Sequence, residues 1–187
     1  HISTGDMFRA AIAAGAELGR RAQGFIEAGK LVPDDVTLGI VCERLAEADA
    51  MSGFILDGFP RTVPQAEGLE DILRAQGVRL DAVVLIEVPE DVLVRRVTGR
   101  RVCEKCGRVY HMEWNPPPGS ACECGGLVTQ RKDDFPETVK KRLATYRTQT
   151  EPLRDYASEG SLVVVDGTGD PDEVFRRITR ALGRCGS

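Results

Sequence analysis

Several features that would assign a chain to a broad class of protein are missing from this sequence. No apolar run approaches the roughly 20 residues that a membrane-spanning helix requires, so we expect no such helix. The sequence does not open on a basic segment followed by an apolar one, so we expect no signal peptide and a cytoplasmic location. Internal repeats and low-complexity tracts are also absent, and apolar runs recur along the whole chain, which argues against disorder.

An excess of basic residues is missing too. The net charge of −4 and the isoelectric point of about 5.3 argue against a general nucleic-acid-binding protein. Lysine is scarce, because only five of the 25 basic residues are lysine and the rest are arginine. Guanidinium groups bind phosphate oxygens through paired hydrogen bonds, so the excess of arginine fits a phosphate-binding protein. A codon bias would explain the excess equally well. The 187 residues suffice for one core and an inserted small module.

The hydrophobic pattern alternates between helical periods and short continuous apolar runs. These runs predict strands at 53–58, 82–88 and 162–165, of which 82–88 is typical of a central strand in a parallel sheet. Helical periods predict helices at 6–14, 18–28, 34–47, 63–75, 90–98, 137–158 and 171–182. The alternation predicts an α/β fold, in which helices flank a parallel sheet and a module is inserted.

A carboxylate and a guanidinium follow the apolar run at 53–58. Asp57 would stand at the carboxyl end of a buried strand, where open α/β sheets bind ligands. In phosphoryl-transfer enzymes such an aspartate helps to hold magnesium, although strand-end aspartates often only begin a turn. Arg61, four residues later, favours metal–phosphate recognition over that alternative.

Arginines also gather around the inserted module. Arg100 precedes it, Arg131 follows it, and Arg142 lies on the next predicted helix. If the insert is a hinged lid, its closure would bring Arg100 and Arg131 over a polyphosphate and exclude water. Two alternatives are a solvated charged surface and ion pairs with Asp133 and Asp134.

Four cysteines in the insert have the spacing of a metal site. Cys103 and Cys106 stand three positions apart before a glycine, whereas Cys122 and Cys124 are one residue closer than in the usual pattern. Four thiolates on two loops predict a tetrahedral structural zinc site, with His111 as a spare ligand. The expected location disfavours disulfides. A redox role is disfavoured because Cys103 does not begin a helix after a strand.

One stretch imitates a phosphate loop. Gly24–Leu31 matches the pattern GxxxxGK. However, Leu31 occupies the position of the magnesium-binding Ser or Thr, and no strand precedes Gly24. We therefore expect Phe25–Ala28 to be helical instead.

Five blocks of the sequence, in order, resemble the adenylate kinase family, in its bacterial form with a long, cysteine-bearing lid. The resemblance runs from His1 to about Leu182. The blocks are Ser3–Arg9, Gly29–Val32, Asp57–Thr62, Gly99–Arg101 and Arg131–Asp134. The resemblance implies a P-loop-kinase-like fold and reversible phosphoryl transfer from Mg-ATP to AMP, giving two ADP, in a monomer that binds neither nucleic acid nor membrane.

The resemblance also implies a role for individual residues. Arg9 and Arg61 would bind the AMP phosphate, and Gln65 and the backbone near Val32 would face its adenine. The full AMP-binding set would be Thr4, Arg9, Lys30, Leu31, Val32, Gly58, Phe59, Pro60, Arg61, Gln65, Arg131 and Arg142. The catalytic set would be Asp57, Arg61, Arg100, Arg131 and Arg142, and the ATP-binding set Arg100, Val109, Tyr110 and Gly169. An AMP-binding module at 3–32 and a lid at 99–134 would flank core segments at 33–98 and 135–187.

The sequence departs from the family pattern at three places. The second cysteine pair is CxC where zinc-bearing relatives have CxxC, and Gly169 replaces a lysine near the adenine. The family's opening strand and phosphate loop are not in the sequence, which implies a truncated adenylate kinase. Three alternatives follow: a non-catalytic AMP- and zinc-binding fragment, a kinase for another nucleoside monophosphate, and a zinc-ribbon interaction protein.

Overall fold

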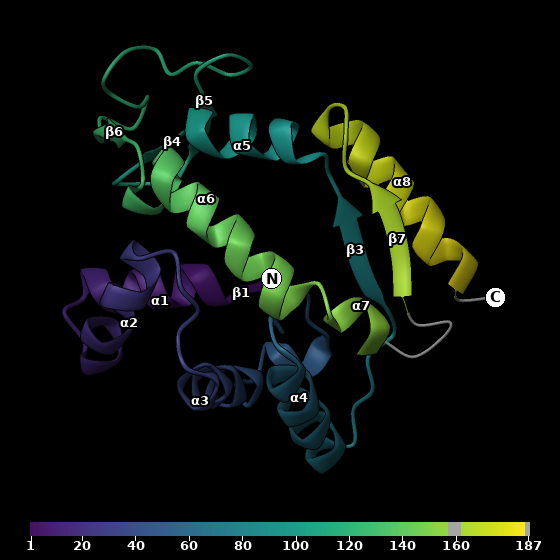
Figure 1. The fold of residues 1–187 in the computed structure, drawn as a ribbon. Coiled ribbons are helices and arrows are strands. Elements are labelled where there is room, and N and C mark those ends of the chain that lie inside the picture. Colours follow the sequence, from purple (N-terminus) through teal and green to yellow (C-terminus); the bar gives the residue numbers. More distant parts are fainter. Residues whose placement is uncertain (157–161, 186–187) are drawn as a thin grey trace. The chain divides into compact units, whose positions relative to one another are not determined.

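The α/β pattern predicted from the sequence is present in the computed structural model, which describes residues 1–156 and 162–185 (Figure 1). The chain divides into two compact units, His1–Val83 with Arg142–Leu162, and Val84–Lys141 with Val163–Ser187. The division into AMP-binding module, lid and core stays a prediction. Within the described residues, no helix has the length and apolar character needed to cross a membrane.

Helices form most of the first unit. The Ser3 hydroxyl accepts a hydrogen bond from the Asp6 N–H and caps the first helix. Thr62 caps the fourth helix in the same way, and Gly77, with φ of +68°, ends it. The helices are α1 (Thr4–Ala13), α2 (Glu17–Glu27), α3 (Asp34–Leu45), α4 (Val63–Gln76) and α7 (Leu153–Tyr156), with short 3₁₀ and π turns η1 (Ala50–Ser52) and η3 (Tyr146–Thr150).

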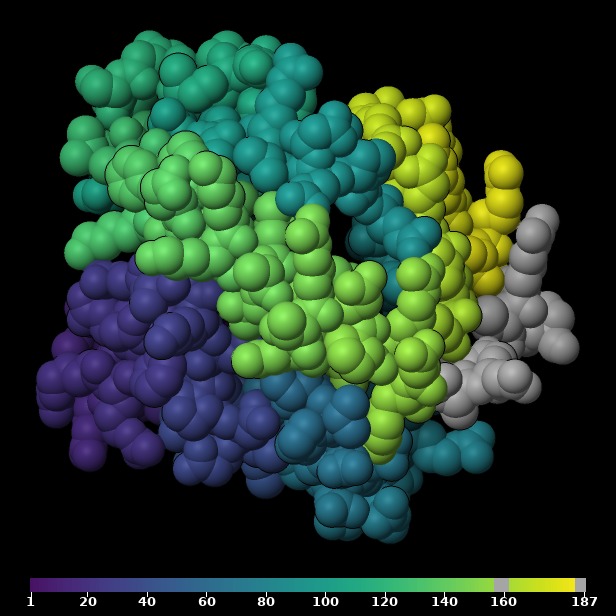
Figure 2. Space-filling view, viewed as in Figure 1, coloured from purple at the N-terminus to yellow at the C-terminus, as the bar shows by residue number. Residues whose placement is uncertain are grey.

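Two clusters of apolar side chains hold these helices together. Phe8, Ala22 and Val32 join α1, α2 and the segment before α3, and Figure 2 shows the purple atoms of the first two helices packed beside the blue atoms of the third. A larger cluster includes Leu45 and Leu69, which lie on α3 and α4. Burial of apolar surface in these clusters is the main stabilising term for this region. Helix α2 runs through Gly24 to Glu27 and has Ala28 as its C-cap, so the helical structure predicted for Phe25–Ala28 is confirmed as far as Glu27.

The strand predicted at 53–58 is mostly wrong. Only β2 (Leu56–Asp57) is a strand, and it pairs in parallel with β1 (Ile2–Ser3), which the sequence pattern missed. Ile55 is 70% exposed although it belongs to the apolar run. Within the described part of the chain β2 pairs with β1 alone, so most of the run has no neighbouring strand to bury it.

The second unit carries a further pair of strands, β3 (Val83–Glu87) and β7 (Leu162–Asp166), whose arrows point the same way in Figure 1. Helices α5 (Glu90–Gly99) and α8 (Pro171–Cys185) follow them. The prediction of β3 as a central strand is wrong for the described residues, because β7 is its one partner there and Ile86 is 48% exposed.

The inserted module forms a small antiparallel sheet that periodicity did not predict. Its strands β4 (Arg100–Cys103), β5 (Val109–His111) and β6 (Val128–Thr129) lie in the order β5-β4-β6. A 3₁₀ turn, η2 (Lys132–Asp134), leads into α6 (Pro136–Thr145). The long helix predicted at 137–158 is therefore divided into α6, η3 and α7. Pro152 has no N–H and cannot continue the helical hydrogen bonds, and residues 157 and 158 lie outside the described residues.

Candidate functional site

The loop after β2 brings three predicted AMP-site residues together. The Gly58 carbonyl accepts hydrogen bonds from Arg61 Nε at 2.6 Å and from Thr4 Oγ1 at 3.2 Å. Gly58 has φ of +67°, a conformation that favours glycine, and a Cβ there would lie 2.7 Å from Arg61 Nη2. The backbone therefore favours glycine here, and a larger residue would also displace the end of the Arg61 side chain.

A buried amide supports this loop from α4. Gln65 is 2% exposed, and its Oε1 accepts a hydrogen bond from the Arg61 N–H at 2.8 Å. Its Nε2 donates to Asp34 Oδ1 at 2.7 Å, and the Thr62 hydroxyl donates to the same oxygen at 3.1 Å. From the sequence, Asp34 was expected only to begin a helix. Its position two residues after the Gly29–Val32 block was the one signal for a role in the site.

The segment before α3 is held through its backbone. Val32 is buried, Leu31 is half-buried and Lys30 is exposed. The Thr37 hydroxyl donates to the Val32 carbonyl at 3.4 Å, and the Thr145 hydroxyl donates to the carbonyl of Gly29 at 3.3 Å. These bonds fix the main chain whose polar groups the resemblance places near adenine.

The other predicted residues of the first unit differ in exposure. Phe59 is 6% exposed and belongs to the hydrophobic core, so its side chain serves packing, and Pro60 is half-buried. Arg9 Nη2 pairs with Asp6 Oδ1 at 2.5 Å. Asp57 is exposed, and its Oδ2 lies 3.4 Å from His1 Nε2. Arg142 is half-buried on α6.

In the second unit, Arg100 forms a bidentate ion pair with a buried carboxylate. Its Nε and Nη2 donate to Asp134 Oδ2 and Oδ1 at 2.8 and 2.6 Å, and Asp134 is 0% exposed. The ion pair considered as an alternative from the sequence is therefore present for Arg100. Planar fork-to-fork pairing of this kind fixes a guanidinium in one orientation. Arg131, directly before η2, is half-buried.

Two residues predicted to meet the ATP base have their polar groups engaged within the protein. Tyr110 is 5% exposed, and its hydroxyl lies 3.1 Å from Cys122 Sγ, so the side chain faces the cysteines. The Gly169 carbonyl accepts a hydrogen bond from Arg96 Nη2 at 3.0 Å. A carbonyl oxygen has two lone pairs, so it can accept a second hydrogen bond as well. Val109, by contrast, is 51% exposed.

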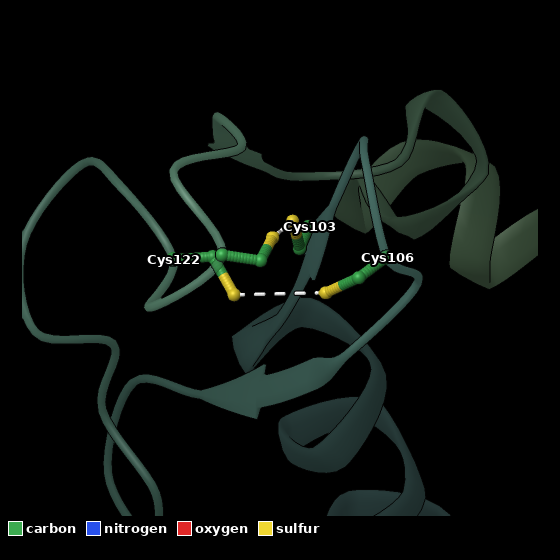
Figure 3. Close-up of side chains that lie close together, drawn as sticks. Cys103, Cys106 and Cys122 are labelled. Carbon is green, nitrogen blue, oxygen red and sulfur yellow. Dashed lines mark hydrogen bonds between the residues drawn. The ribbon is translucent and has the colours of Figure 1, made fainter.

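The four cysteines of the inserted module converge on one point. Their sulfur atoms all lie within 4.8 Å of one another, with 3.5 Å between Cys103 and Cys124 and 3.7 Å between Cys106 and Cys122, the pair joined by a dashed line in Figure 3. A tetrahedral zinc ion with Zn–S bonds of about 2.3 Å places its sulfurs about 3.8 Å apart. The cluster fits zinc, and the short CxC spacing does not prevent four sulfurs from gathering.

Backbone geometry explains how the short spacing closes. Gly107 and Gly125 follow the two cysteine pairs and have φ of +72° and +76°, which lets the chain turn after each pair. A Cβ at Gly126 would lie 2.6 Å from Cys103 Sγ. The spare ligand proposed from the sequence lies elsewhere, because the His111 ring stacks on Trp114 with 3.8 Å between centroids.

Hydrogen bonds within the cluster shift the acidity of the thiols. The Tyr110 hydroxyl lowers the pKa of the Cys122 thiol to about 6, and the Cys106 N–H lowers the pKa of Cys103. The Gly126 N–H lowers the pKa of Cys124, but bonds with the Cys106 and Cys103 thiols outweigh it and raise that pKa to about 12. The cluster therefore contains two thiols biased toward the thiolate that metals bind.

Comparison with known proteins agrees with the resemblance seen in the sequence. The family model described as adenylate kinase matches residues 1–161. The adenylate kinase of Moorella thermoacetica is 54% identical over 98% of this chain and 86% of its own length. Those of Desulfitobacterium hafniense and Listeria monocytogenes serotype 4b are each 55% identical over 97% of the chain, and the match covers 85% and 86% of their lengths. This chain is a phosphotransferase of the adenylate kinase family.

Proposed function

We propose that this nucleoside monophosphate kinase transfers a phosphoryl group reversibly from ATP to AMP, giving two ADP, and binds AMP at the loop after β2. The observation that carries the proposal is the loop after β2, where Thr4 and the Arg61 side chain donate to the Gly58 carbonyl and Gln65 accepts from the Arg61 backbone N–H. A guanidinium has five N–H donors, enough to bond both to a carbonyl and to a phosphate. We assign both contacts to Arg61, whose Nε donates to the Gly58 carbonyl.

The remaining AMP contacts are proposed around this arrangement. Arg9 binds the AMP phosphate with Arg61, and Arg131 and Arg142 add positive charge. Gln65 and the main chain of Lys30, Leu31 and Val32 face the adenine, while Phe59 and Pro60 shape the loop through packing and backbone. The hydrogen bonds that hold the Gln65 amide between Arg61 and Asp34 support this assignment, because they order the group proposed to meet the base.

Phosphoryl transfer of this kind needs alignment and charge neutralisation, and no covalent protein intermediate. We assign the neutralisation to Arg61, Arg100, Arg131 and Arg142. The bidentate bond to Asp134 supports the role of Arg100, since it keeps the guanidinium ordered before a phosphate arrives. Val109 and the Gly169 backbone are proposed to contact the ATP base.

Two metals are part of the proposal. Magnesium, when bound, screens the charge of the ATP phosphates, and the exposed Asp57 carboxylate fits an ion held mainly by phosphates and water. Zinc, when bound by Cys103, Cys106, Cys122 and Cys124, fixes the shape of the lid, and the convergence of the four sulfurs supports it. A cytoplasmic location and a monomeric state are proposed from the sequence alone.

Arginine variants test the proposed roles. In a coupled assay of ADP formation, we expect Arg61→Ala and Arg100→Ala each to lower kcat/KM by about 100-fold or more, as for removal of a group that stabilises developing charge. Arg74→Ala is the matched control, because Arg74 is exposed on α4 and pairs with Asp71. Near-normal turnover in either test variant with an unchanged circular dichroism spectrum would contradict its role. AMP binding without any turnover in the parent chain would support a non-catalytic AMP-binding protein instead.

A further inference from the structure

The Gln65 amide lies between two partners of opposite hydrogen-bonding character. On one side the backbone N–H of Arg61, which can only donate, lies 2.8 Å from the Oε1 of Gln65. On the other side the Asp34 carboxylate, which accepts, is 2.7 Å from Nε2. Because Gln65 is 2% exposed, water contributes little to the choice between its two amide orientations. The partners therefore determine which end of the amide is oxygen and which is nitrogen.

Asp34 is itself held in place for this contact. Its Oδ1 also accepts a hydrogen bond from the Thr62 hydroxyl at 3.1 Å. The Thr62 hydroxyl in turn accepts from the Gln65 N–H at 3.2 Å, so Asp34, Thr62 and Gln65 form a closed set of bonds between α3 and the start of α4. Rotation of the Gln65 amide would place nitrogen against the Arg61 N–H and oxygen against the Asp34 carboxylate. Both new contacts would be repulsive.

The orientation decides what the amide can offer a base. The Oε1 of Gln65 has two lone pairs, of which one is engaged, so it can accept one more hydrogen bond. The Nε2 has two N–H groups, of which one is engaged, so it can donate one more. An adenine presents an amino N–H beside a ring nitrogen acceptor, which complements this pair. A 6-oxopurine presents an oxygen beside a ring N–H, which would require the rotated amide.

We propose that Asp34 is a specificity-determining positioning residue of the AMP site. It fixes the orientation of the Gln65 amide, and through it the site accepts adenine and rejects 6-oxopurines. This inference rests on the proposed contact between Gln65 and the adenine. Asp34 itself touches no substrate in this scheme, and acts through Gln65.

The substitution Asp34→Asn tests the proposal by an expected gain of binding. An asparagine can accept from Gln65 as the carboxylate does, or can turn its own amide and donate to a rotated Gln65. Isothermal titration of the full chain with AMP and with IMP, whose base is a 6-oxopurine, gives both dissociation constants. We expect the Kd for IMP to fall about tenfold and the Kd for AMP to change less than about threefold, since one of two repulsive contacts is relieved.

Asp35→Asn is the matched control, because Asp35 is exposed in the same first turn of α3 and the substitution removes the same charge. It should leave both constants unchanged. Asp34→Ala, which removes the acceptor, should lower the preference for AMP over IMP by weakening AMP binding. Thermal unfolding of each variant checks that the fold is retained. A purely structural role for Asp34 would weaken AMP and IMP binding equally, and that result overturns the proposal.

Gln65→Leu separates this inference from the proposed function. If it abolishes the preference for AMP while Asp34→Asn leaves the preference as in Asp35→Asn, Gln65 contacts the base and the role of Asp34 is wrong. If Gln65→Leu leaves the preference intact, the contact with adenine is wrong, and the inference about Asp34 fails with it.

Discussion

The α1–α4 region and the inserted module at 99–134, proposed to be the lid, keep their structure by different means. Between α1 and α4, two clusters of buried apolar side chains join the helices. In the lid the buried cluster consists of Cys103, Tyr110 and Cys122, with Cys124 and Val128 packed against it. The burial of large aliphatic side chains away from water stabilises the first region, whereas the lid buries mainly sulfur atoms and one aromatic ring.

The difference follows from size. A segment of fewer than about 40 residues encloses too little apolar surface to fold by burial alone, and metals or disulfides usually supply the rest. The lid strands β4, β5 and β6 are two to four residues long, and Leu127 between the second cysteine pair and β6 is 54% exposed. The comparison therefore separates a region stabilised by its core from one that we expect to depend on a metal.

Removal of the metal should have the largest effect on folding, and it should affect the lid and not the α1–α4 region. Because structural zinc contributes folding free energy directly, we expect a strong chelator to unfold the lid and leave the α1–α4 region helical. The sole tryptophan, Trp114, lies in the lid against His111, so its fluorescence reports the lid while far-ultraviolet circular dichroism reports the helices.

Cysteine variants provide the control for that experiment. Cys103→Ser should reproduce the fluorescence change without chelator and lower the zinc content measured by mass spectrometry. Cys42→Ser should do neither, because Cys42 is exposed on α3 outside the cluster. If the chelator leaves the fluorescence spectrum unchanged, the lid does not depend on a metal, and the proposed difference between the two regions is wrong.

A cavity in the α1–α4 core should give the next largest effect. Leu69 is 2% exposed in the larger apolar cluster, and Leu69→Ala should lower the free energy of unfolding by about 2–5 kcal/mol. Urea titration followed by circular dichroism measures the change. Leu80→Ala, at a position 41% exposed, should cost far less, and equal losses in the two variants would contradict burial as the source of stability.

Removal of one hydroxyl from the lid should have an intermediate effect. Tyr110→Phe keeps the buried ring and deletes the group 3.1 Å from Cys122 Sγ. Since groups that hydrogen-bond metal ligands typically change metal affinity by 10- to 100-fold, we expect about tenfold weaker zinc binding in competition with a chelating dye. Tyr146→Phe, at an exposed position on η3, is the control and should bind zinc normally.

The smallest effect should come from an exposed ion pair at the end of α3. Arg44 donates to both oxygens of Asp49, and this bond lowers the pKa of Asp49 below 3.8. A lowered folded-state pKa stabilises the fold above pH 3.8, and this contribution is lost as the pH falls through the folded value. Urea unfolding should show Asp49→Asn slightly less stable than the parent at pH 7 and equal to it near pH 2. A difference that persists at low pH would point to packing instead.

The sequence predicted most helices and the strands β3 and β7 near their observed bounds but missed the shorter strands, for a physical reason. Every described α-helix except α7 spans at least ten residues, enough to show its period, and α4 also shows its cap residues, Thr62 and Gly77. Strand β1 has two residues and no period to detect, and β2 keeps two of the six residues in its apolar run. Burial of such a run depends on neighbouring strands, which lie far away in sequence.

The candidate site divides in the same way. Residues in dense motifs, such as Gly58 and Arg61, lie together because a short loop connects them. Asp34 was missed because its partners Thr62 and Gln65 are 28 and 31 residues away. The closure of the CxC pair depends on the turn at Gly125, and the burial of Tyr110 depends on that closure.

Gly58 has a consequence for the range of sequences that can occupy this fold. Gly58 and Gly77 have almost the same φ, +67° and +68°, and would look alike in a list of turn residues. A side chain at Gly77 would enter open space, so asparagine, which tolerates this conformation, could replace it at modest cost. At Gly58 even a methyl group would meet the Arg61 guanidinium. Because the end of the Arg61 side chain would have to move to make room at position 58, a library of all single substitutions should admit more alternatives at position 77 than at position 58, although the backbone alone does not distinguish them.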